Sequence, residues 1–428
     1  MRVLVVGAYG LLGGHVTARL LGDGLQVVGV GRDVADATRR FPGAAWVEAD
    51  LRQTRRAQWI AHLDGVDAVV NCAGALQDGP RDDVRAVHVD TMDALTSACE
   101  AAGVRRFVHI SAVGVDRGVG AFLSTKKAAD EALQRSNLDW IILRPGLVIA
   151  PVAYGGSALL RALAGFPLVI PALNPESRIQ TVSVDDVAEA VIRSLYVKRT
   201  KFVCDVVAKE ATSLADLLFD LRAWLGFAPA SLITTPAWCG AIAAGGADLL
   251  GQLGWRSPMR TTALEQLAAG VQGRAEDAHT HLGFAPRSLS QTLATWPSGV
   301  QERWFARLYL MKPLLIATLA VFWAVSGAVG FAGHESAIGL LTTAGLPSAL
   351  SATAVYGGST VDLMLAILAC VRATARLAFV GMIAVTTAYL VSASVWVPAL
   401  WVDPLGPLVK AVPAAVLALV ALAILDER

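Results

Sequence analysis

The sequence has few of the residues that build disulfide frameworks, metal centres or nucleic-acid-binding surfaces. Five cysteines are scattered over 428 residues. They form no Cys-x-x-Cys pair and no metal-ligand spacing, so we expect no metal and a reduced, cytoplasm-facing domain. The formal net charge is +1, which gives no electrostatic basis for binding nucleic acid. The opening apolar run is too short for a cleavable signal peptide, so we expect the N-terminal domain to stay in the cytoplasm.

The chain is instead rich in apolar residues, which make up 55% of it. Its length exceeds what one hydrophobic core usually organises, so we expect two or more domains. Most of the charge lies in the first half, which is typical of an α/β domain, and the apolar excess lies at the C-terminal end.

A glycine-rich turn joins the first expected strand, residues 1–6, to a helical stretch that runs through Leu20. Such a turn presents backbone N–H groups at a helix N-terminus, where the partial positive charge suits a pyrophosphate. The pattern therefore favours a bound dinucleotide over a plain tight turn. The turn reads Gly7-Ala8-Tyr9-Gly10-Leu11-Leu12-Gly13.

Apolar runs of strand length alternate with helical patterns as far as residue 143. This alternation predicts an α/β fold with a Rossmann-type doubly wound parallel sheet, whose C-terminal strand ends form the ligand edge. Residues 151–297 are less regular and are expected to hold a substrate-side lobe, including the apolar segments 168–172 and 202–207. The expected strands are 25–30, 46–49, 66–71, 107–111 and 139–143, and the expected helices are 84–102 and 124–134.

The segment 236–254 is apolar and glycine-rich. It suits either an amphipathic helix on a membrane surface or a buried packing helix, and the second is favoured.

Four apolar runs follow, each near the ~20 residues that a helix needs to cross a bilayer. They predict an all-α bundle of four transmembrane helices. Positive residues precede the first run, separate the second from the third and end the chain at Arg428, which places both termini on the cytoplasmic side. We therefore expect a multi-pass protein of a bacterial-type inner (plasma) membrane. The runs are 313–331, 349–371, 377–397 and 408–425.

Several further motifs accompany the glycine turn in residues 1–195. Asp50 and Leu51 follow the third strand, Cys72-Ala73-Gly74 the fourth, Ser111 the fifth and Arg144-Pro145-Gly146 the sixth, with Val182 to Ala188 downstream. This half resembles the short-chain dehydrogenase/reductase superfamily in its extended or atypical form. The resemblance implies NAD(P) binding by Gly7, Tyr9, Gly10, Leu11, Leu12, Gly13, Arg32, Asp50, Leu51, Cys72, Ala73, Gly74, Ser111, Lys126, Pro145 and Gly146.

Arg32 bears on the choice of cofactor. In this fold an acidic residue at the end of the second strand binds the ribose 2′-hydroxyl and repels a 2′-phosphate. Gly31 holds that place, with Arg32 and Asp33 after it. A guanidinium suits a phosphate, so NADP(H) is favoured and NAD(H) is the alternative.

The catalytic pair departs from the family pattern. These reductases use a tyrosine four residues before a lysine, whose ammonium lowers the pKa of the phenol. Here Lys126 is present but Phe122 holds the tyrosine position. Lys126 and Ser111 are the catalytic candidates. Tyr154 is expected to be a loop residue and His88 a packing residue.

The last part of the chain resembles the DoxX-like family of four-helix membrane proteins in its hydropathy and in the segment 403–410. Asp362 lies within the second apolar run, where a carboxylate is costly and faces a partner. Hydrogen bonding within the bundle is favoured over proton or quinone handling. Trp396, Trp401 and Tyr356 are expected to anchor at the interface.

Together these features predict a short-chain dehydrogenase-like domain over residues 1–235, a helical extension over 236–303 and a DoxX-like membrane domain over 304–428. We expect a membrane-anchored, NADP(H)-dependent oxidoreductase that reduces a lipophilic carbonyl or quinone, alone, as a homo-oligomer or in a membrane complex. Phe122 keeps open a non-catalytic structural or redox-sensing protein that binds NAD(P)H. A transporter is less favoured because the apolar runs carry few polar groups.

Overall fold

The computed structural model describes residues 1–79, 82–117, 120–264 and 270–426, so Arg428 lies outside the described residues. The chain separates into two compact units. The first unit comprises Met1–Asp248 and Ser257–Ala306, and the second comprises Leu249–Arg256 and Arg307–Arg428.

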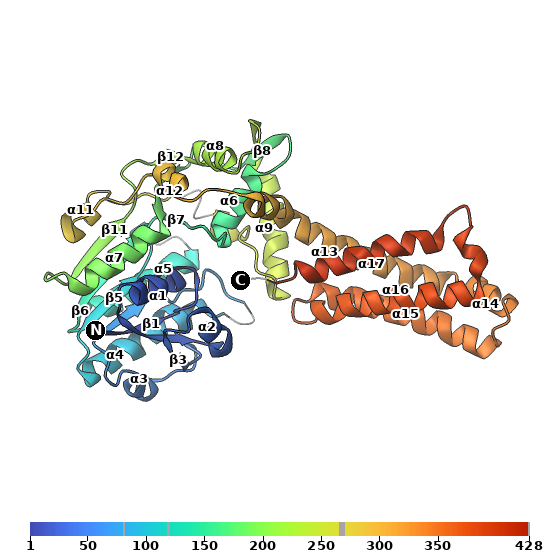
Figure 1. The fold of residues 1–428 in the computed structure, drawn as a ribbon, viewed down its shortest axis with the longest axis horizontal. Helices are drawn as coiled ribbons and strands as arrows, with labels where there is room; N and C mark the ends of the chain where they lie inside the picture. Colours follow the sequence, from blue (N-terminus) through green and yellow to red (C-terminus); the bar gives the residue numbers. More distant parts are fainter. Residues whose placement is uncertain (80–81, 118–119, 265–269, 427–428) are drawn as a thin grey trace. The chain divides into compact units, whose positions relative to one another are not determined.

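In its described residues, the first unit is built on a parallel sheet of seven strands in the order β11-β6-β5-β4-β1-β2-β3 (Figure 1). The order reverses between β1 and β4, which is the switch point where this fold opens a crevice at the carboxyl ends of its strands. The sequence placed residues 202–207 in the substrate-side lobe. This was wrong, because β11 pairs in parallel with β6 and completes the main sheet. The strands are β1 (Arg2–Val6), β2 (Gln26–Gly31), β3 (Ala45–Glu48), β4 (Ala68–Asn71), β5 (Arg106–Ile110), β6 (Asp139–Pro145) and β11 (Phe202–Val206).

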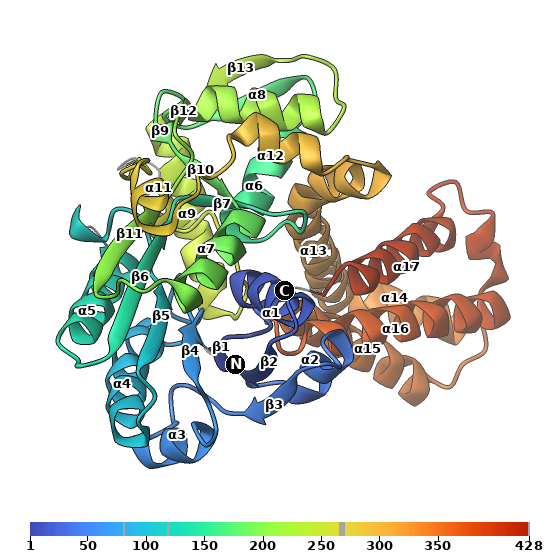
Figure 2. The same cartoon turned by 60° about the vertical axis from the view of Figure 1, so that its left-hand side comes forward.

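Helices cover both faces of this sheet, which makes it doubly wound as predicted (Figure 2). One core joins the strands to α1 and α7 through residues such as Leu20 and Val191. The other joins them to α3, α4 and α5 through residues such as Trp59, Met92 and Leu133. The expected helix 84–102 starts with a π-helical turn, Ala86–Asp90. The helices of the sheet are α1 (Leu11–Gly22), α2 (Val34–Arg40), α3 (Arg56–His62), α4 (Thr91–Ala102), α5 (Gly120–Gln134), α7 (Val184–Tyr196) and α11 (Asp277–Leu282).

A second lobe of the first unit has its own core, formed around Leu217, Leu221 and Ile170. Three short strand pairs frame it: β7 with β10, β8 with β13 and β9 with β12. Its elements are β7 (Leu147–Ile149), α6 (Gly155–Ala164), β8 (Val169–Ala172), β9 (Arg178–Ile179), β10 (Thr181–Ser183), β12 (Thr212–Ser213), α8 (Leu214–Trp224), β13 (Ser231–Thr234) and α12 (Leu289–Thr295). The helix α9 (Ala237–Gln252) starts in the first unit and continues into the second, which takes over at Leu249.

The helix α9 is not a buried packing helix, so the favoured expectation for this segment was wrong. Its large apolar side chains, including Trp238 and Ile242, are exposed, and only small residues face the protein.

The second unit is a bundle of apolar helices (Figure 1). Three helices in the described residues, α13 (Val300–Ala332), α15 (Ser348–Cys370) and α16 (Ala375–Trp396), are long and apolar enough to cross a membrane. The fourth apolar helix, α17 (Pro407–Ala423), has 17 residues. A further helix, α14 (His334–Thr343), lies between α13 and α15. The core contains Trp323, Leu365, Phe379 and Ala418, one residue from each apolar helix.

Asp362 is buried in this bundle and joins three of its helices. Its Oδ2 accepts a hydrogen bond of 2.7 Å from Ser326 on α13, and its Oδ1 accepts one of 3.0 Å from Tyr389 on α16. Gly358 leaves room for the tyrosine, because a Cβ there would lie 2.7 Å from its hydroxyl. These bonds satisfy a polar group that would be costly in lipid.

Candidate functional site

The glycine turn packs tightly against the chain that leaves β4. Gly7 has φ +73°, and a Cβ on it would lie 3.1 Å from the backbone of Ala73. A Cβ on Gly13 would overlap the carbonyl oxygen of Gly7, so α1 sits directly on the turn. No side chain caps α1 at Gly10, and its first turn carries no acidic residue. The turn therefore leaves a helix N-terminus open at the carboxyl edge of the sheet, which fits a pyrophosphate.

Three apolar candidates build the frame around this turn. Leu11 is the first residue of α1, and Leu12 packs against the core on the α1 face. Leu51 packs against the opposite core, and its carbonyl accepts a hydrogen bond of 3.1 Å from the Thr91 hydroxyl.

Tyr9 fixes the end of β2. Its ring lies over Gly31, where a Cβ would come within 2.7 Å of ring atom Cδ1. Its hydroxyl accepts hydrogen bonds from the backbone N–H groups of Arg32, at 3.1 Å, and Asp33, at 3.3 Å. The Asp33 carboxylate accepts a bond of 3.0 Å from the N–H of Asp36 and caps α2. The acidic side chain after β2 is therefore turned toward its own helix.

Arg32 and Asp50 lie at the neighbouring ends of β2 and β3. Arg32 Nη2 is 3.1 Å from Asp82 Oδ1. Asp50 Oδ2 is 2.6 Å from Arg52 Nη2, and this hydrogen bond lowers the pKa of the Asp50 carboxyl. This end of the crevice is lined with charged groups, as the adenosine half of a dinucleotide site requires.

Lys126 lies on the other side of the switch point. It is 3% exposed, and its ammonium donates hydrogen bonds to the carbonyls of Ala73, at 3.2 Å, and Ile110, at 2.9 Å. A Cβ on Gly74 would be 3.6 Å from its Nζ. Burial lowers the pKa of Lys126 to about 8, opposed by the charge of Asp130. The ammonium therefore sits between the ends of β4 and β5, beside Ala73, whose backbone also packs against Gly7 of the glycine turn.

Cys72 is a poor nucleophile in this structure. Burial raises the pKa of its thiol to about 12, although the charge of Lys126 acts in the opposite direction. A thiol of that pKa stays protonated at neutral pH.

Ser111 follows β5 directly, and its N–H donates to the carbonyl of Leu143 at 2.8 Å. Its side chain is buried, and within the described residues its hydroxyl makes no hydrogen bond of standard geometry. The sequence placed the Arg-Pro-Gly motif after the sixth strand, but β6 includes Arg144 and Pro145. Gly146 then passes so close to Gln180 that a Cβ would overlap its carbonyl oxygen.

Phe122 occupies the helix face of Lys126 one turn earlier. Its ring meets the His88 ring edge-on, with centroids 5.7 Å apart. His88 Nε2 accepts from the N–H of Ala75 at 3.1 Å, and its Nδ1 lies 2.9 Å from the Thr125 hydroxyl. Burial, and then the charge of Lys126, lower the pKa of His88 to about 2. His88 is therefore a neutral residue that holds the loop after β4 against α5.

An ionic cluster that was not predicted from the sequence lies next to Lys126. Asp130, one turn further along α5, accepts hydrogen bonds from Arg144 Nε, at 3.2 Å, and Nη2, at 3.0 Å. Arg144 Nη1 also donates to Asp116 at 2.7 Å. Burial raises the pKa of the Asp130 carboxyl, while the charge of Arg144 opposes the rise. The four-residue spacing of Lys126 and Asp130 was the available signal, since it puts both on one helix face.

The remaining motif residues are structural in this fold. Asp186 of the downstream signature pairs with Arg287, with Oδ1 3.0 Å from Nε. Tyr154 is 39% exposed and precedes α6. The described residues contain no cluster of His, Cys, Asp and Glu that could hold a metal.

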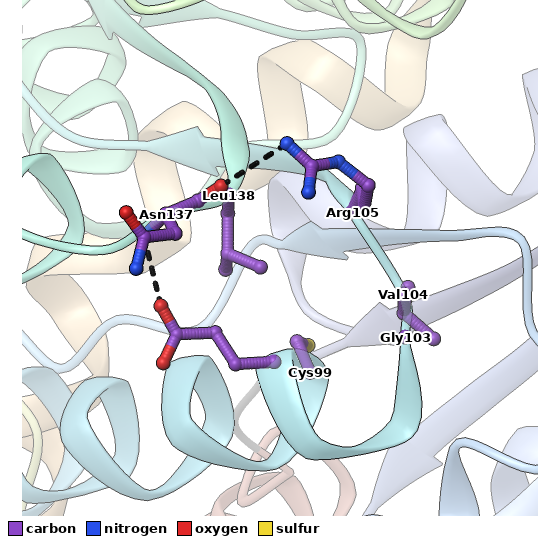
Figure 3. Close-up of a pocket in the computed structure, with 7 residues that line it drawn as sticks. Cys99, Gly103, Val104, Arg105, Asn137 and Leu138 are labelled. Carbon is purple, nitrogen blue, oxygen red and sulfur yellow. Dashed lines mark hydrogen bonds between the residues drawn. The ribbon is translucent and has the colours of Figure 1, made fainter.

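A pocket of about 330 Å³ lies at the opposite edge of the sheet, where β5 and β6 begin (Figure 3). Glu100 accepts a hydrogen bond of 2.8 Å from the N–H of Asn137, whose carbonyl accepts from Arg105 at 3.4 Å. Because ligands of this fold bind at the carboxyl ends of the strands, this pocket is separate from the crevice.

The fold and the crevice define a dinucleotide-binding α/β protein with a helical membrane domain. Comparison with known proteins agrees. Residues 7–196 match a family described as NAD(P)H-binding, and residues 320–419 match the DoxX-like family. The chain therefore combines an NAD(P)H-binding domain with a C-terminal DoxX-like domain.

The UPF0659 protein YMR090W of Saccharomyces cerevisiae is 31% identical over 158 residues, which are 34% of this chain and 69% of that protein. The uncharacterized protein Mb2073c of Mycobacterium bovis is 28% identical over 196 residues, 46% of this chain but only 20% of that protein. The structure of MoeE5 in complex with UDP-glucuronic acid and NAD is 22% identical, with a TM-score of 0.52, and the match covers 69% of this chain and 97% of MoeE5. At this identity the structural likeness concerns the fold.

Proposed function

We propose that this protein is a membrane-anchored, NADP(H)-dependent oxidoreductase that reduces a lipophilic carbonyl or quinone at the cytoplasmic face of the membrane. The carrying observation is the buried ammonium of Lys126, held by two backbone carbonyls, one of them from Ala73 beside the glycine turn. A membrane domain in the same chain would keep the protein at the bilayer, where apolar substrates are concentrated.

The cofactor would lie along the crevice from β3 to β6. The N–H groups at the turn from Gly7 to Gly13 suit its pyrophosphate, and Asp50 suits its adenine. Arg32 favours the 2′-phosphate of NADP(H) over NAD(H), because Asp33 caps α2 and leaves no carboxylate committed to a ribose hydroxyl. Cys72, Ala73 and Gly74, with Pro145 and Gly146, would border the nicotinamide half.

Bound NADPH would supply the hydride. The chain's own part is to hold the cofactor and to supply a proton, and Phe122 cannot exchange one. Lys126 has a pKa of about 8 and is therefore protonated at neutral pH but close to titration. Ser111 is the hydroxyl nearest in sequence to the end of β5 and is the second proton-handling candidate.

The test uses the purified full-length protein in nanodiscs under anaerobic conditions. NADPH is bound first, and quinones and apolar carbonyls are then added while the nicotinamide absorbance band is followed. We expect oxidation of NADPH by the wild type, loss of it in Lys126→Met and retention in Lys127→Met, which alters the neighbouring lysine of the same helix. Bound NADPH that no compound in the panel oxidises would overturn the proposal.

Phe122 favours one alternative, a protein that binds NAD(P)H and reports its redox state to the membrane domain. A sensor should bind NADPH tightly and remain inert, and Phe122→Tyr would restore the missing hydroxyl. Turnover by the unmodified protein would exclude a purely sensory role.

A further inference from the structure

The helix α9 buries its small residues and exposes its large apolar residues, which is the reverse of the usual arrangement. Gly240, Ala244, Ala247 and Gly251 are buried, at the spacing of one helix face. At Gly240 the approach is close, since a Cβ would lie 2.6 Å from the side chain of Leu173. The inward face therefore consists of residues with little apolar surface to bury.

The large apolar side chains point the other way. Trp238 is 65% exposed, Ile242 is 68% exposed and Leu249 is 61% exposed. At ~100° per residue these three lie within roughly 40° of one another, opposite the small residues. We call Trp238, Ile242 and Leu249 the outer stripe. A contiguous stripe of this kind marks an interaction surface, because isolated exposed hydrophobic residues are common but aligned ones are not.

The C-terminal end of α9 is fixed to the membrane bundle within the second unit. The carbonyl of Leu253 accepts a hydrogen bond of 3.0 Å from the N–H of Arg372. Trp255 Nε1 donates to the carbonyl of Cys370 at 2.7 Å, and the Arg372 guanidinium lies 5.7 Å from the Trp255 ring centroid. Cys370 is the last residue of α15, so α9 ends at the level where a membrane-spanning helix ends. Tryptophan and arginine are the residues typical of that level.

The charge of α9 is also compatible with a lipid surface. Asp248 is the only charged residue in the helix, and its Oδ1 lies 2.7 Å from Arg260 Nε. Its Oδ2 accepts a hydrogen bond from the Thr261 hydroxyl. The helix therefore presents no unpaired carboxylate that anionic headgroups would repel.

We propose that α9 is an interfacial helix whose outer stripe is embedded in the headgroup region of the bilayer. Continuity with the end of α15 favours lipid over a protein partner, because the last turn of α9 is already at the membrane surface. The inference requires that the second unit is a membrane domain, but it does not depend on the proposed oxidoreductase activity.

Spin labelling of the full-length protein in nanodiscs tests this. Single cysteines are introduced in a chain whose five native cysteines are replaced by serine, as Trp238→Cys, Ile242→Cys and Leu249→Cys. Ile367→Cys, on an exposed position of α15, is the lipid control, and Arg39→Cys, on α2, is the aqueous control. Collision rates with oxygen, which concentrates in lipid, and with a water-soluble nickel chelate are compared at each position.

We expect the outer stripe to behave like Ile367, with oxygen collisions several-fold more frequent than nickel collisions. Stripe labels that collide with nickel as often as Arg39 would show a water-exposed helix and overturn the proposal. Labels shielded from both reagents would show a protein partner and overturn it equally.

A second measurement avoids the cysteine replacements. The unmodified protein is irradiated in vesicles that contain a diazirine lipid, and the adducts are mapped by peptide mass spectrometry. Adducts should form on α9 but not on Phe219, an exposed apolar residue of α8. Their absence from α9 in vesicles where α15 is labelled would contradict the proposal.

Discussion

Arg32 and Asp33 place opposite charges side by side after β2, and their side chains contact different partners. Asp33 caps α2, whereas the Arg32 guanidinium pairs with Asp82. A bound 2′-phosphate would compete with Asp82 for this guanidinium. The proposed preference for NADP(H) therefore depends on the Arg32 side chain, which would exchange Asp82 for the phosphate.

The variant Arg32→Ala should weaken NADPH binding by about 10- to 100-fold, the equivalent of one charge-assisted hydrogen bond, and leave NADH binding nearly unchanged. Calorimetric titration of both nucleotides measures this. Arg39→Ala, which removes an exposed arginine of α2, is the matched control and should alter neither affinity. Equal losses for the two nucleotides would contradict a role in phosphate recognition.

Lys126 gives the site a pH dependence whose sign follows from its burial. Its pKa is about 8 in the folded protein, below the ordinary lysine value of 10.5. The unfolded chain therefore binds more protons between these values, and the burial penalty of the ammonium weakens as the pH rises through 8. The affinity for the cofactor should instead fall as the pH rises through 8, because the positive charge of Lys126 that would hold the cofactor is lost.

We predict that NADPH affinity falls by about tenfold for each pH unit above 8 until another group compensates. Titrations between pH 6 and 10 measure this. Lys127→Met should keep the alkaline loss, and Lys126→Met should bind weakly with no such loss. If the NADPH affinity of Lys126→Met still fell above pH 8, a group other than Lys126 would be responsible for the pH dependence.

At the scale of elements, α1 shows how a residue without a side chain lets a helix pack directly against the turn that precedes it. Gly13 touches Gly7 so closely that no Cβ fits, whereas Gly22, at the other end of α1, has nothing within 4 Å of a built Cβ. The same substitution at these two positions should therefore have opposite effects.

Gly13→Ala should destabilise the first unit by about 1–3 kcal/mol, because the added methyl overpacks the turn, and should weaken NADPH binding. Gly22→Ala should be neutral or slightly stabilising, since alanine favours the helix. Thermal unfolding with and without NADPH measures both. A Gly13→Ala protein as stable as Gly22→Ala would mean that α1 can move away from the turn at little cost.

At the scale of the whole molecule, the distribution of positive charge predicts an orientation in the membrane that can be tested. Arg372 lies in the connection between α15 and α16 and Arg376 is the second residue of α16, whereas His334 and Glu335 begin α14, between α13 and α15. The positive-inside rule places the first pair in the cytoplasm and the second pair outside.

In a chain without its native cysteines, Glu335→Cys should react with a membrane-impermeant maleimide in intact cells. Ala373→Cys should react only after permeabilisation. Gel shift of the labelled protein measures both. The reverse pattern would place the nucleotide crevice outside the cell and exclude reduction by cytoplasmic NADPH.

Much of this architecture could be predicted from local sequence. The strand before Gly7, the helix after Gly10 and the lysine four residues after Phe122 each follow from short-range pattern, because backbone conformation and helix faces depend on neighbouring residues. The apolar helices are equally local, since crossing a membrane requires a continuous run.

Tertiary structure decided the rest. The strand β11 looked like part of a separate lobe until its pairing with β6 showed that it completes the sheet, because strand partners are set by contacts between distant segments. The cluster of Asp130, Arg144 and Asp116 needs α5 and β6 side by side. Composition suggested that α9 would be buried, but only the folded protein shows which of its faces the neighbouring chain covers. The sequence alone determined what kinds of element this protein has, and long-range packing determined which surfaces those elements bury and which they leave exposed.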